Sequence, residues 1–378
     1  MKQRTMFLGA AVVLLAIVAV VFLRGCQPAQ PVEYRIGVVL SLTGRGATYG
    51  QRALNGMQLA VDELNATETF RNRLTKLIVE DSQSAAPQAL SAFRKLIDVD
   101  HVPVAVGFVL SDEVLSCAPV ANDRGVVLLT TAAGSDKIRD AGDYIFRNRE
   151  SGALAADKIA SACIQRFGSK EAAILHSNSA NGVSYRDDFK KAFERLGGTI
   201  SLAIGYDEGK TDYRAQIEQL RAKSPKAVYL AGLDQELGLI LKQAKEVGFN
   251  SQFFASPGAI SSKLLEIAGS AAEGLVSASA PFDLNSNDQR IQAFVNSYRS
   301  RFNDAPDFIA ANSYDAINMI AGLFKNGATT SDQIKAGLYS TKDYPGVGGQ
   351  TTFDADGEVR KPITLVQVRN GEFIPLGD

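Results

Sequence analysis

The chain has 378 residues, of which 46% are hydrophobic and 21% charged, so it can bury cores for two globular domains and is neither disordered nor collagen-like. Its 40 Lys and Arg residues nearly balance its 41 Asp and Glu residues, which leaves a net charge of −1 at pH 7. No block of basic residues stands out, so the composition excludes a nucleic-acid partner.

The first 26 residues indicate an export signal or a membrane anchor. A short basic segment precedes an uncharged run over 6–23, which is typical of a signal peptide and is about long enough to span a bilayer. The sequence LRGC resembles a bacterial lipobox, in which Cys26 would be lipidated after cleavage, although Arg24 departs from that motif. In the alternative, the run stays uncleaved as a transmembrane anchor. In both cases we expect residues 27–378 to be periplasmic or otherwise extracytoplasmic and tethered to the membrane.

Residues 27–33 form a short linker rich in Pro and Gln, after which predicted strands and helices alternate. Apolar and β-branched runs predict strands, and apolar residues at helical spacing predict helices. The strands are expected at 34–40, 75–81, 103–108 and 125–130, and the helices at 51–66 and 87–99. Short strands separated by helices are typical of parallel βαβ units. We therefore predict a doubly wound block over about 34–150.

The same alternation restarts near residue 153 and continues to about residue 280. Here strands are expected at 171–176, 199–206, 226–232 and 251–256, and helices at 187–198, 212–223 and 235–247. Two long helical stretches follow, at 289–302 and 308–324. The chain closes with an apolar segment whose Asn370-Gly371 pair predicts a two-residue hairpin turn. The predicted fold class is therefore α/β, with two doubly wound blocks.

The glycine-rich stretch SLTGRGATYG, at 41–50, joins a predicted strand to a predicted helix and raises the question of a phosphate site. A dinucleotide fingerprint needs G-x-G-x-x-G, but Tyr49 occupies the third glycine slot, where it would push the backbone away from a pyrophosphate. We interpret the stretch as a turn whose glycines permit positive φ angles. The loop at 205–211 is not a P-loop, because three residues separate its glycines where four are required.

The sequence indicates neither an enzyme nor a metal site. No G-x-S-x-G nucleophile motif occurs. His101 and His176 stand alone, and Cys117 and Cys163 lack the neighbours of a zinc site. A disulfide between these cysteines is compatible with an extracytoplasmic location, but their spacing does not establish one. We expect no metal and no cofactor.

Small polar loops follow three strands of the first block, at the edge where open α/β sheets bind ligands. Ser111 ends a strand and opens a helix, so its hydroxyl and the amides after it are suited to bind an anion. The amides expected to point into the same crevice are those of Ala132, Ala133, Gly134 and Ser135. Ordinary helix caps are the alternative for any one loop, but the convergence of three loops on one edge favours a binding site.

Together these motifs resemble those of type I periplasmic solute-binding proteins of the leucine/isoleucine/valine-binding family. The matching segments are IGVVLSLTGRGATYGQRALNGMQLAVDELN, VAVGFVLSDEV, GVVLLTTAAGSDKI, YIFRN, FDLNSN and YDAINM, and they extend over about 34–370. The resemblance implies two Rossmann-like lobes joined by a three-stranded hinge, a solute enclosed between them, and delivery to an ABC permease. The first lobe would comprise 34–151 and 281–350, and the second 152–280 and 351–378.

The resemblance also assigns roles to residues of the first lobe. Ser111, Ala132 and Gly134 would bind the carboxylate of a ligand, and Tyr49 would line the cleft. Gly134 departs from the family, because amino-acid binders usually carry a threonine there.

The second lobe and the hinge depart further from the amino-acid binders. Pro257 stands where they place an acid against the ligand ammonium, and Asn181 and Leu233 stand where they place aromatic walls. Gly152 replaces an aspartate, while Arg149 adds a positive charge nearby. An unpaired ammonium in a closed cleft would cost several kcal/mol, so a carboxylate or an amide without an amine fits better than an α-amino acid.

The sequence therefore predicts a tethered solute-binding protein without catalytic activity. The alternative is a non-transport envelope protein of the same fold, acting as a ligand sensor or as a regulator of a cell-wall enzyme. Arg149 is the candidate counter-charge for an anionic solute; in the other interpretation it covers the hinge surface, and the site suits a neutral solute.

Overall fold

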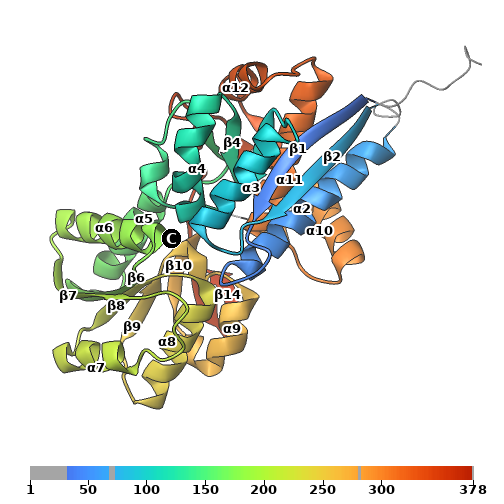
Figure 1. The fold of residues 1–378 in the computed structure, drawn as a ribbon. Coiled ribbons are helices and arrows are strands. Elements are labelled where there is room, and N and C mark those ends of the chain that lie inside the picture. Colours follow the sequence, from blue (N-terminus) through green and yellow to red (C-terminus); the bar gives the residue numbers. More distant parts are fainter. Residues whose placement is uncertain (1–31, 68–72, 280–281, 377–378) are drawn as a thin grey trace, which may run out of the picture.

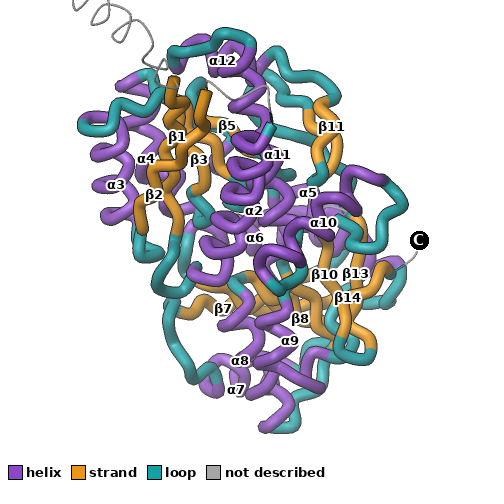
Figure 2. The backbone as a smooth tube through the Cα atoms, turned by 90° about the vertical axis from the view of Figure 1, so that its right-hand side faces the viewer, coloured by secondary structure: helices purple, strands orange, loops and turns teal. Residues whose placement is uncertain are grey.

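The computed structural model describes residues 32–67, 73–279 and 282–376, which form two lobes (Figure 1). The predicted signal or anchor, including Cys26, lies outside the described residues, as does most of the linker. In the described ranges, no helix is both long enough and apolar enough to cross a membrane. Seen from the side, one lobe carries the sheet of β1 to β5 and the other carries the sheet that ends in β14 (Figure 2).

The first sheet consists of parallel strands in the order β2-β1-β3-β4-β5. The strands are β1 (Val32–Leu40), β2 (Arg73–Asp81), β3 (Val104–Gly107), β4 (Val127–Thr130) and β5 (Ile145–Arg147). The chain moves from β1 outward to β2 and then back past β1 to β3, so the order reverses between β1 and β3. Such a switch point opens a crevice beyond the carboxyl ends of the two strands.

The second sheet repeats this order with its parallel strands and adds a hairpin: β14-β13-β10-β9-β8-β6-β7. The strands are β6 (Glu171–Ser177), β7 (Thr199–Tyr206), β8 (Ala227–Ala231), β9 (Gln252–Ala255), β10 (Val276–Ser279), β13 (Thr364–Arg369) and β14 (Glu372–Pro375). Its switch point lies between β6 and β8. The predicted hairpin turn is confirmed, because Asn370 and Gly371 have φ values of 53° and 78° between antiparallel strands.

Helices cover both lobes. Those of the first lobe are α2 (Ala47–Ala66), α3 (Ala86–Asp98), α4 (Ser111–Arg124), α10 (Gln289–Phe302), α11 (Phe308–Lys325) and α12 (Ser331–Tyr339). Those of the second lobe are α5 (Gly152–Gln165), α6 (Ala180–Arg195), α7 (Arg214–Lys223), α8 (Asp234–Glu246) and α9 (Ser262–Ala268). A small ribbon of β11 (Tyr344–Gly346) and β12 (Gly349–Thr351) lies beside α11.

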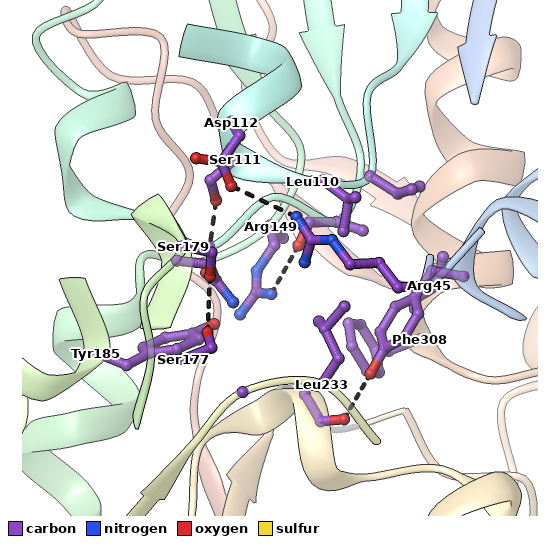
Figure 3. Close-up of a pocket in the computed structure, with 18 residues that line it drawn as sticks. Arg45, Leu110, Ser111, Asp112, Arg149, Ser177, Ser179, Tyr185, Leu233 and Phe308 are labelled. Carbon is purple, nitrogen blue, oxygen red and sulfur yellow. Dashed lines mark hydrogen bonds and ion pairs between the residues drawn. The ribbon is translucent and has the colours of Figure 1, made fainter. Parts of the chain in front are cut away.

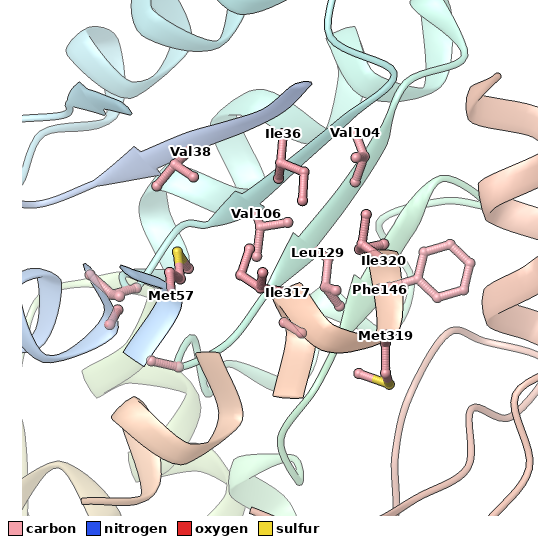
Figure 4. Close-up of a cluster of buried hydrophobic side chains, with 14 of the residues drawn as sticks. Ile36, Val38, Met57, Val104, Val106, Leu129, Phe146, Ile317, Met319 and Ile320 are labelled. Atoms are coloured by element: carbon pink, nitrogen blue, oxygen red, sulfur yellow. The ribbon is translucent and has the colours of Figure 1, made fainter. Parts of the chain in front are cut away.

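Buried apolar layers lie on both faces of each sheet. On one face of the first sheet, Ile36, Val106 and Leu129 contact a cluster that includes Met57 of α2 and Ile317 of α11 (Figure 4). The alternate strand residues pack on the opposite face, against α3 and α4. Because both faces are buried at the centre of the sheet, β3 and β4 are almost wholly apolar, which is why they were recognisable as short apolar runs.

The chain passes between the lobes three times: between β5 and α5, between β10 and α10, and before β13. Near the third passage, Phe353 and Val359 pair with each other and pack in the first lobe's core. Phe353 meets the ring of Phe146 edge-on, with 5.5 Å between centroids. The segment just after residue 350, which the sequence suggested for the second lobe, is therefore held on the first.

Cys117 and Cys163 are both free and buried. Cys117 belongs to α4 in the first lobe and Cys163 to α5 in the second. Burial raises the pKa of each thiol to about 12. The open question of a disulfide is thus answered: these two cysteines are not bonded to each other.

Candidate functional site

A small cavity lies between the lobes, where the two switch points face each other (Figure 3). Its free volume is about 20 Å³, roughly enough for one water molecule, so side chains fill most of the space between the two walls. The lining residues are Arg45, Tyr49, Val109, Leu110, Ser111, Asp112, Ala132, Gly134, Arg149, Ser177, Ser179, Asn181, Tyr185, Gly232, Leu233, Gly258, Phe308 and Ile309.

The glycine-rich stretch after β1 serves to bring α2 against the end of that strand. Gly44 has a φ of 80°, which allows the chain to turn sharply. A Cβ on Gly50 would lie 2.0 Å from the carbonyl oxygen of Ser41, so only glycine permits this approach. The helix begins at Ala47, four residues earlier than predicted, and its first turn carries Tyr49 to the cleft. The glycines therefore position a side chain instead of cradling a phosphate.

Tyr49 connects the two lobes directly. Its hydroxyl donates to the carbonyl oxygen of Gly258 at 2.6 Å and accepts from the amide of Asp234 at 3.3 Å. Burial, reinforced by the negative charge of Asp234, raises the pKa of Tyr49 well above its ordinary value, so the phenol stays neutral. The two lobes are therefore in contact across the cleft.

Ser111 is the first residue of α4, and a buried carboxylate fixes the start of that helix. Glu113 accepts hydrogen bonds from the hydroxyls of Ser41 at 2.7 Å and Ser82 at 2.5 Å, which follow β1 and β2. Burial raises the pKa of Glu113. The Ser111 hydroxyl in turn accepts from the amide of Ser135 at 3.1 Å. Three strand ends are thereby linked around Ser111.

The turn after β4 has two kinds of amide. Those of Ala133 and Ser135 are already engaged, the former with the Thr130 hydroxyl at 3.2 Å and the latter with Ser111. The amides of Ala132 and Gly134, which line the cavity, have no acceptor among the described residues. A buried amide without a partner is costly, so these two are suited to bind an oxygen of a ligand.

Two buried arginines hold this turn from beneath. Arg147 donates to the carbonyl oxygen of Ser135 at 2.8 Å and forms a buried ion pair with Glu358. Arg149 donates to the carbonyl oxygen of Ala132 at 2.9 Å. The carbonyl groups are thus turned towards the arginines.

Arg149 lies inside the molecule and lines the cavity, with 3% of its surface exposed, so the hinge-surface interpretation is wrong. Its guanidinium lies 3.4 Å from the carboxylate of Glu150 and 5.8 Å from the ring centre of Phe308. Burial alone would lower the pKa of Arg149, but the neighbouring Tyr185 and Glu150 side chains raise it overall. Arg149 therefore brings to the cavity a guanidinium that is paired with the buried carboxylate of Glu150.

A second arginine spans the mouth of the cleft. Arg45 lies 3.7 Å from Asp112 of the first lobe and forms an ion pair with Glu208 of the second. Asp112 also accepts from the amide of Ala180 at 3.1 Å, across the cleft. Burial raises the pKa of Glu208 to about 7, against the effect of Arg45. The 205–211 loop, a plain loop in sequence terms, thus takes part in closing the cleft.

The second-lobe wall comes from α6 and from the ends of β8 and β9. Asn181 accepts a hydrogen bond of 3.4 Å from the Ser111 hydroxyl, and Leu233 adds an apolar side chain. Gly258 reaches the lining, whereas its neighbour Pro257 is buried outside it.

The cavity brings together seven of the ten expected site residues: Tyr49, Ser111, Ala132, Gly134, Arg149, Asn181 and Leu233. Ala133, Ser135 and Pro257 lie just behind the lining. Among the residues that sequence reasoning missed are Arg45, Tyr185 and Phe308. A signal for Tyr185 was present, because it lies four residues after Asn181 on the same face of α6.

Chemically, the site offers donors and a buried positive charge but no assembled catalytic or metal centre. Within the described residues, no group of three or more His, Cys, Asp or Glu side chains could hold a metal ion. The arrangement is suited to holding a small solute between two lobes.

Comparison with known proteins supports this interpretation. The sequence profile of the periplasmic binding protein family matches residues 33–372. The leucine-, isoleucine-, valine-, threonine-, and alanine-binding protein of Pseudomonas aeruginosa is 26% identical over 333 residues, which cover 86% of this chain and 87% of that protein. Both the family and this relative are described as binding proteins, not as enzymes.

Solved structures have the same fold. LivJ of Streptococcus pneumoniae, a branched-chain amino acid transporter substrate-binding protein in complex with isoleucine, superposes with a TM-score of 0.84 at 26% identity, covering 92% of this chain and all of LivJ (100%). A solute-binding protein of an ABC transporter from Rhodopseudomonas palustris, in complex with 3,4-dihydroxybenzoic acid, gives a TM-score of 0.82 at 23% identity, covering 91% and 96%.

Proposed function

Because the chain belongs to the periplasmic binding protein family, we propose that it captures a small carboxylate or amide without an α-amino group and delivers it to an ABC permease. The relatives named above include an amino-acid-binding protein and the substrate-binding protein of an amino-acid transporter, which favours transport over the sensor or regulator role. The two solved structures hold an amino acid and an aromatic acid, so the class of solute proposed for this chain rests on its own cavity.

The observation that carries the proposal is the imbalance between donors and acceptors in the cavity. The unpaired amides of Ala132 and Gly134 and the guanidinium of Arg149 all attract an oxygen or a negative charge. The one carboxylate among the lining residues is Asp112, and it is engaged by Arg45 and by the Ala180 amide. An ammonium group entering this cavity would therefore lose its water without meeting an unengaged carboxylate among the lining residues.

Closure would follow the population-shift mechanism. A solute bound to the first-lobe turn gains its second set of contacts, from Asn181 and Leu233, only when the lobes close, so it stabilises the closed form. Tyr49 adds contacts between the lobes in that form.

A matched series of solutes tests the proposal. Leucine, 4-methylpentanoate and 4-methylpentanamide share one branched chain and differ only at the α-amino and carboxyl groups. We expect the carboxylate to raise the unfolding temperature of the purified protein, because a ligand that binds only the native state stabilises it by RT ln(1 + [L]/Kd). Stabilisation by leucine but not by 4-methylpentanoate would refute the solute class.

We also propose that the N-terminal segment tethers the protein through lipidated Cys26. Replacement of Cys26 by Ser should release the protein from membranes. If the variant stays with the membrane fraction and mass spectrometry finds an intact N-terminus, the segment acts as an uncleaved anchor instead.

A further inference from the structure

Tyr185 is a cavity residue that belongs to the second lobe but reaches the first. It lies on α6, is 1% exposed, and lines the cavity beside Arg149 (Figure 3). The Arg149 guanidinium lines the same cavity, and burial raises the pKa of the Tyr185 phenol, which therefore stays neutral. A neutral phenol beside a buried guanidinium can donate a hydrogen bond to an oxygen of a solute.

Two glycines make room for this ring. A Cβ on Gly134 would lie 2.1 Å from the Tyr185 hydroxyl oxygen, and a Cβ on Gly152 would lie 2.2 Å from Cε1 of the same ring. Neither glycine has a positive φ, so the backbone conformation does not require glycine at either position. Space for the Tyr185 ring is the physical reason for both. Two departures from the amino-acid binders, one in each lobe, thus have one explanation.

The ring takes up a defined part of the cleft. It packs between the turn after β4 and the start of α5, at the hinge side of the cavity. Tyr185 also belongs to a buried apolar cluster of the second lobe. Its hydroxyl lies next to Gly134, whose amide is one of the two unpaired donors. A solute bound to that amide would meet the phenol directly.

We propose that Tyr185 determines the specificity of the site: its ring limits the length of solute on which the lobes can close, and its hydroxyl donates to the solute oxygen bound near Arg149. This inference rests on the proposed function, because it specifies which carboxylates that function accepts. It predicts that the protein prefers carboxylates with short chains, and that the Tyr185 side chain controls both the accepted chain length and one hydrogen bond to the carboxylate.

The length limit is tested with Tyr185→Ala and with straight-chain carboxylates from acetate to octanoate, using calorimetry. The wild type should bind the short members best. The variant should bind hexanoate and octanoate at least about tenfold more tightly than the wild type does, since fit of single methylenes changes affinity by about that factor. Thermal unfolding checks that the variant is folded, and Tyr185→Leu, which keeps an apolar side chain of intermediate size, replaces it if it is not.

The hydroxyl is tested separately with Tyr185→Phe. We expect the same preference for length but affinity weaker by about three- to tenfold for every carboxylate, because one hydrogen bond is lost. Tyr229→Phe is the matched control: Tyr229 is a buried second-lobe tyrosine outside the lining, and its hydroxyl has no hydrogen-bond partner among the described residues. This control should bind the whole series as the wild type does.

A double-mutant cycle tests the contact itself without any solute. Gly152 begins α5 in the same lobe as Tyr185, so its contact with the ring does not depend on closure. Gly152→Ala should lower the free energy of unfolding of the wild type, and most of that loss should vanish in the Tyr185→Ala background, with a coupling of about fivefold or more in the unfolding equilibrium constant. Additive effects of the two substitutions overturn the spatial argument.

The outcomes separate the two claims. If the wild type binds carboxylates but Tyr185→Ala and Tyr185→Leu keep its order of preference, the role of Tyr185 is refuted and the proposed function stands. If the wild type binds no carboxylate and no amide, the proposed function fails and this inference fails with it.

Discussion

The two walls of the cleft are built on different principles. The first-lobe wall consists of backbone amides and small side chains, at Ser111, Ala132 and Gly134, held from behind by a buried network. The second-lobe wall presents larger side chains, such as Asn181 and Tyr185, and its rim carries titratable carboxylates. Under the proposed function, the first wall would bind an oxygen-bearing group common to many solutes, while the second would determine which solute is accepted and at which pH the lobes close.

The sharpest way to break the first wall is to remove its buried support. Glu358→Ala leaves Arg147 buried without its counter-charge, beneath the turn that carries Ser135. We expect the free energy of unfolding to fall by about 3–5 kcal/mol, because an uncompensated charge remains inside the lobe. Denaturant titration measures the loss. Asp157→Ala, which removes the partner of Arg195 in a half-exposed pair (58% and 48%), is the control and should cost less than about 1 kcal/mol. Equal losses would mean that the buried pair does not support the wall.

The next largest effect should come from the charge behind the first wall. Arg149→Ala should weaken binding of 4-methylpentanoate by roughly tenfold or more, since a hydrogen bond to a charged group contributes about 1.5–3 kcal/mol. Binding of 4-methylpentanamide, which carries no charge, should change little and serves as the internal control. Calorimetry with both solutes decides the matter. An equal loss for the two solutes would assign Arg149 a structural role and favour a neutral solute.

Tyr49 tests the contact between the walls. Tyr49→Phe removes the hydrogen bonds to Gly258 and Asp234 but keeps the ring that packs in the first lobe's core. We expect solute affinity to fall by about two- to tenfold, as for the loss of one or two neutral hydrogen bonds, with a smaller change in unfolding. Calorimetry and denaturant titration are compared. Unchanged affinity would show that closure does not depend on this bridge.

The smallest expected effect is a pH dependence contributed by the second wall. The pKa of Glu208 is raised to about 7 and that of Asp188 to about 6, in each case mainly by burial. In an open form we expect both groups to regain water and their ordinary, lower pKa values, so closing takes up protons. The charged groups that face the two carboxylates are Arg45, Asp112 and Glu236 at Glu208, and Asp136, Asp187 and Lys191 at Asp188.

Closing of the lobes should therefore be favoured at low pH. Above about pH 7 both carboxylates are charged and costly to bury, and this cost disappears as the pH falls through about 7 and then about 6. Solute affinity should therefore be about threefold higher at pH 5.5 than at pH 8, after allowance for solvent screening. In Glu208→Gln the change between pH 8 and pH 6.5 should disappear. A wild-type affinity that falls towards low pH contradicts the prediction.

Much of the first wall could be predicted from sequence because its parts are local. Ser111 and the 132–135 turn come within four residues of the ends of buried strands, and parallel strands place their carboxyl ends along one edge. Periodicity along the chain is enough to find such positions. In this wall the predicted lining was wrong only at neighbouring positions: the amides of Ala133 and Ser135 bond to Thr130 and Ser111, and these two residues do not line the cavity.

The second wall and the hinge could not be predicted in the same way, because they depend on contacts between distant segments. Glu208 lies more than 160 positions from Arg45, and nothing in the loop around it signals that partner. Gly134 and Gly152 make sense only once the ring of Tyr185 is placed between the lobes. Such complementarity exists only in the closed molecule and produces no periodic pattern in the sequence.

The burial of Cys117 and Cys163 has a practical consequence. A thiol whose pKa is about 12 is almost fully protonated at neutral pH, and only the thiolate reacts readily with maleimides. If Cys26 is also replaced, single cysteines introduced at the rim of each lobe would be the sites that accept a dye. The protein could then be converted into an optical reporter, in which energy transfer between two fluorophores registers the arrival of its own solute.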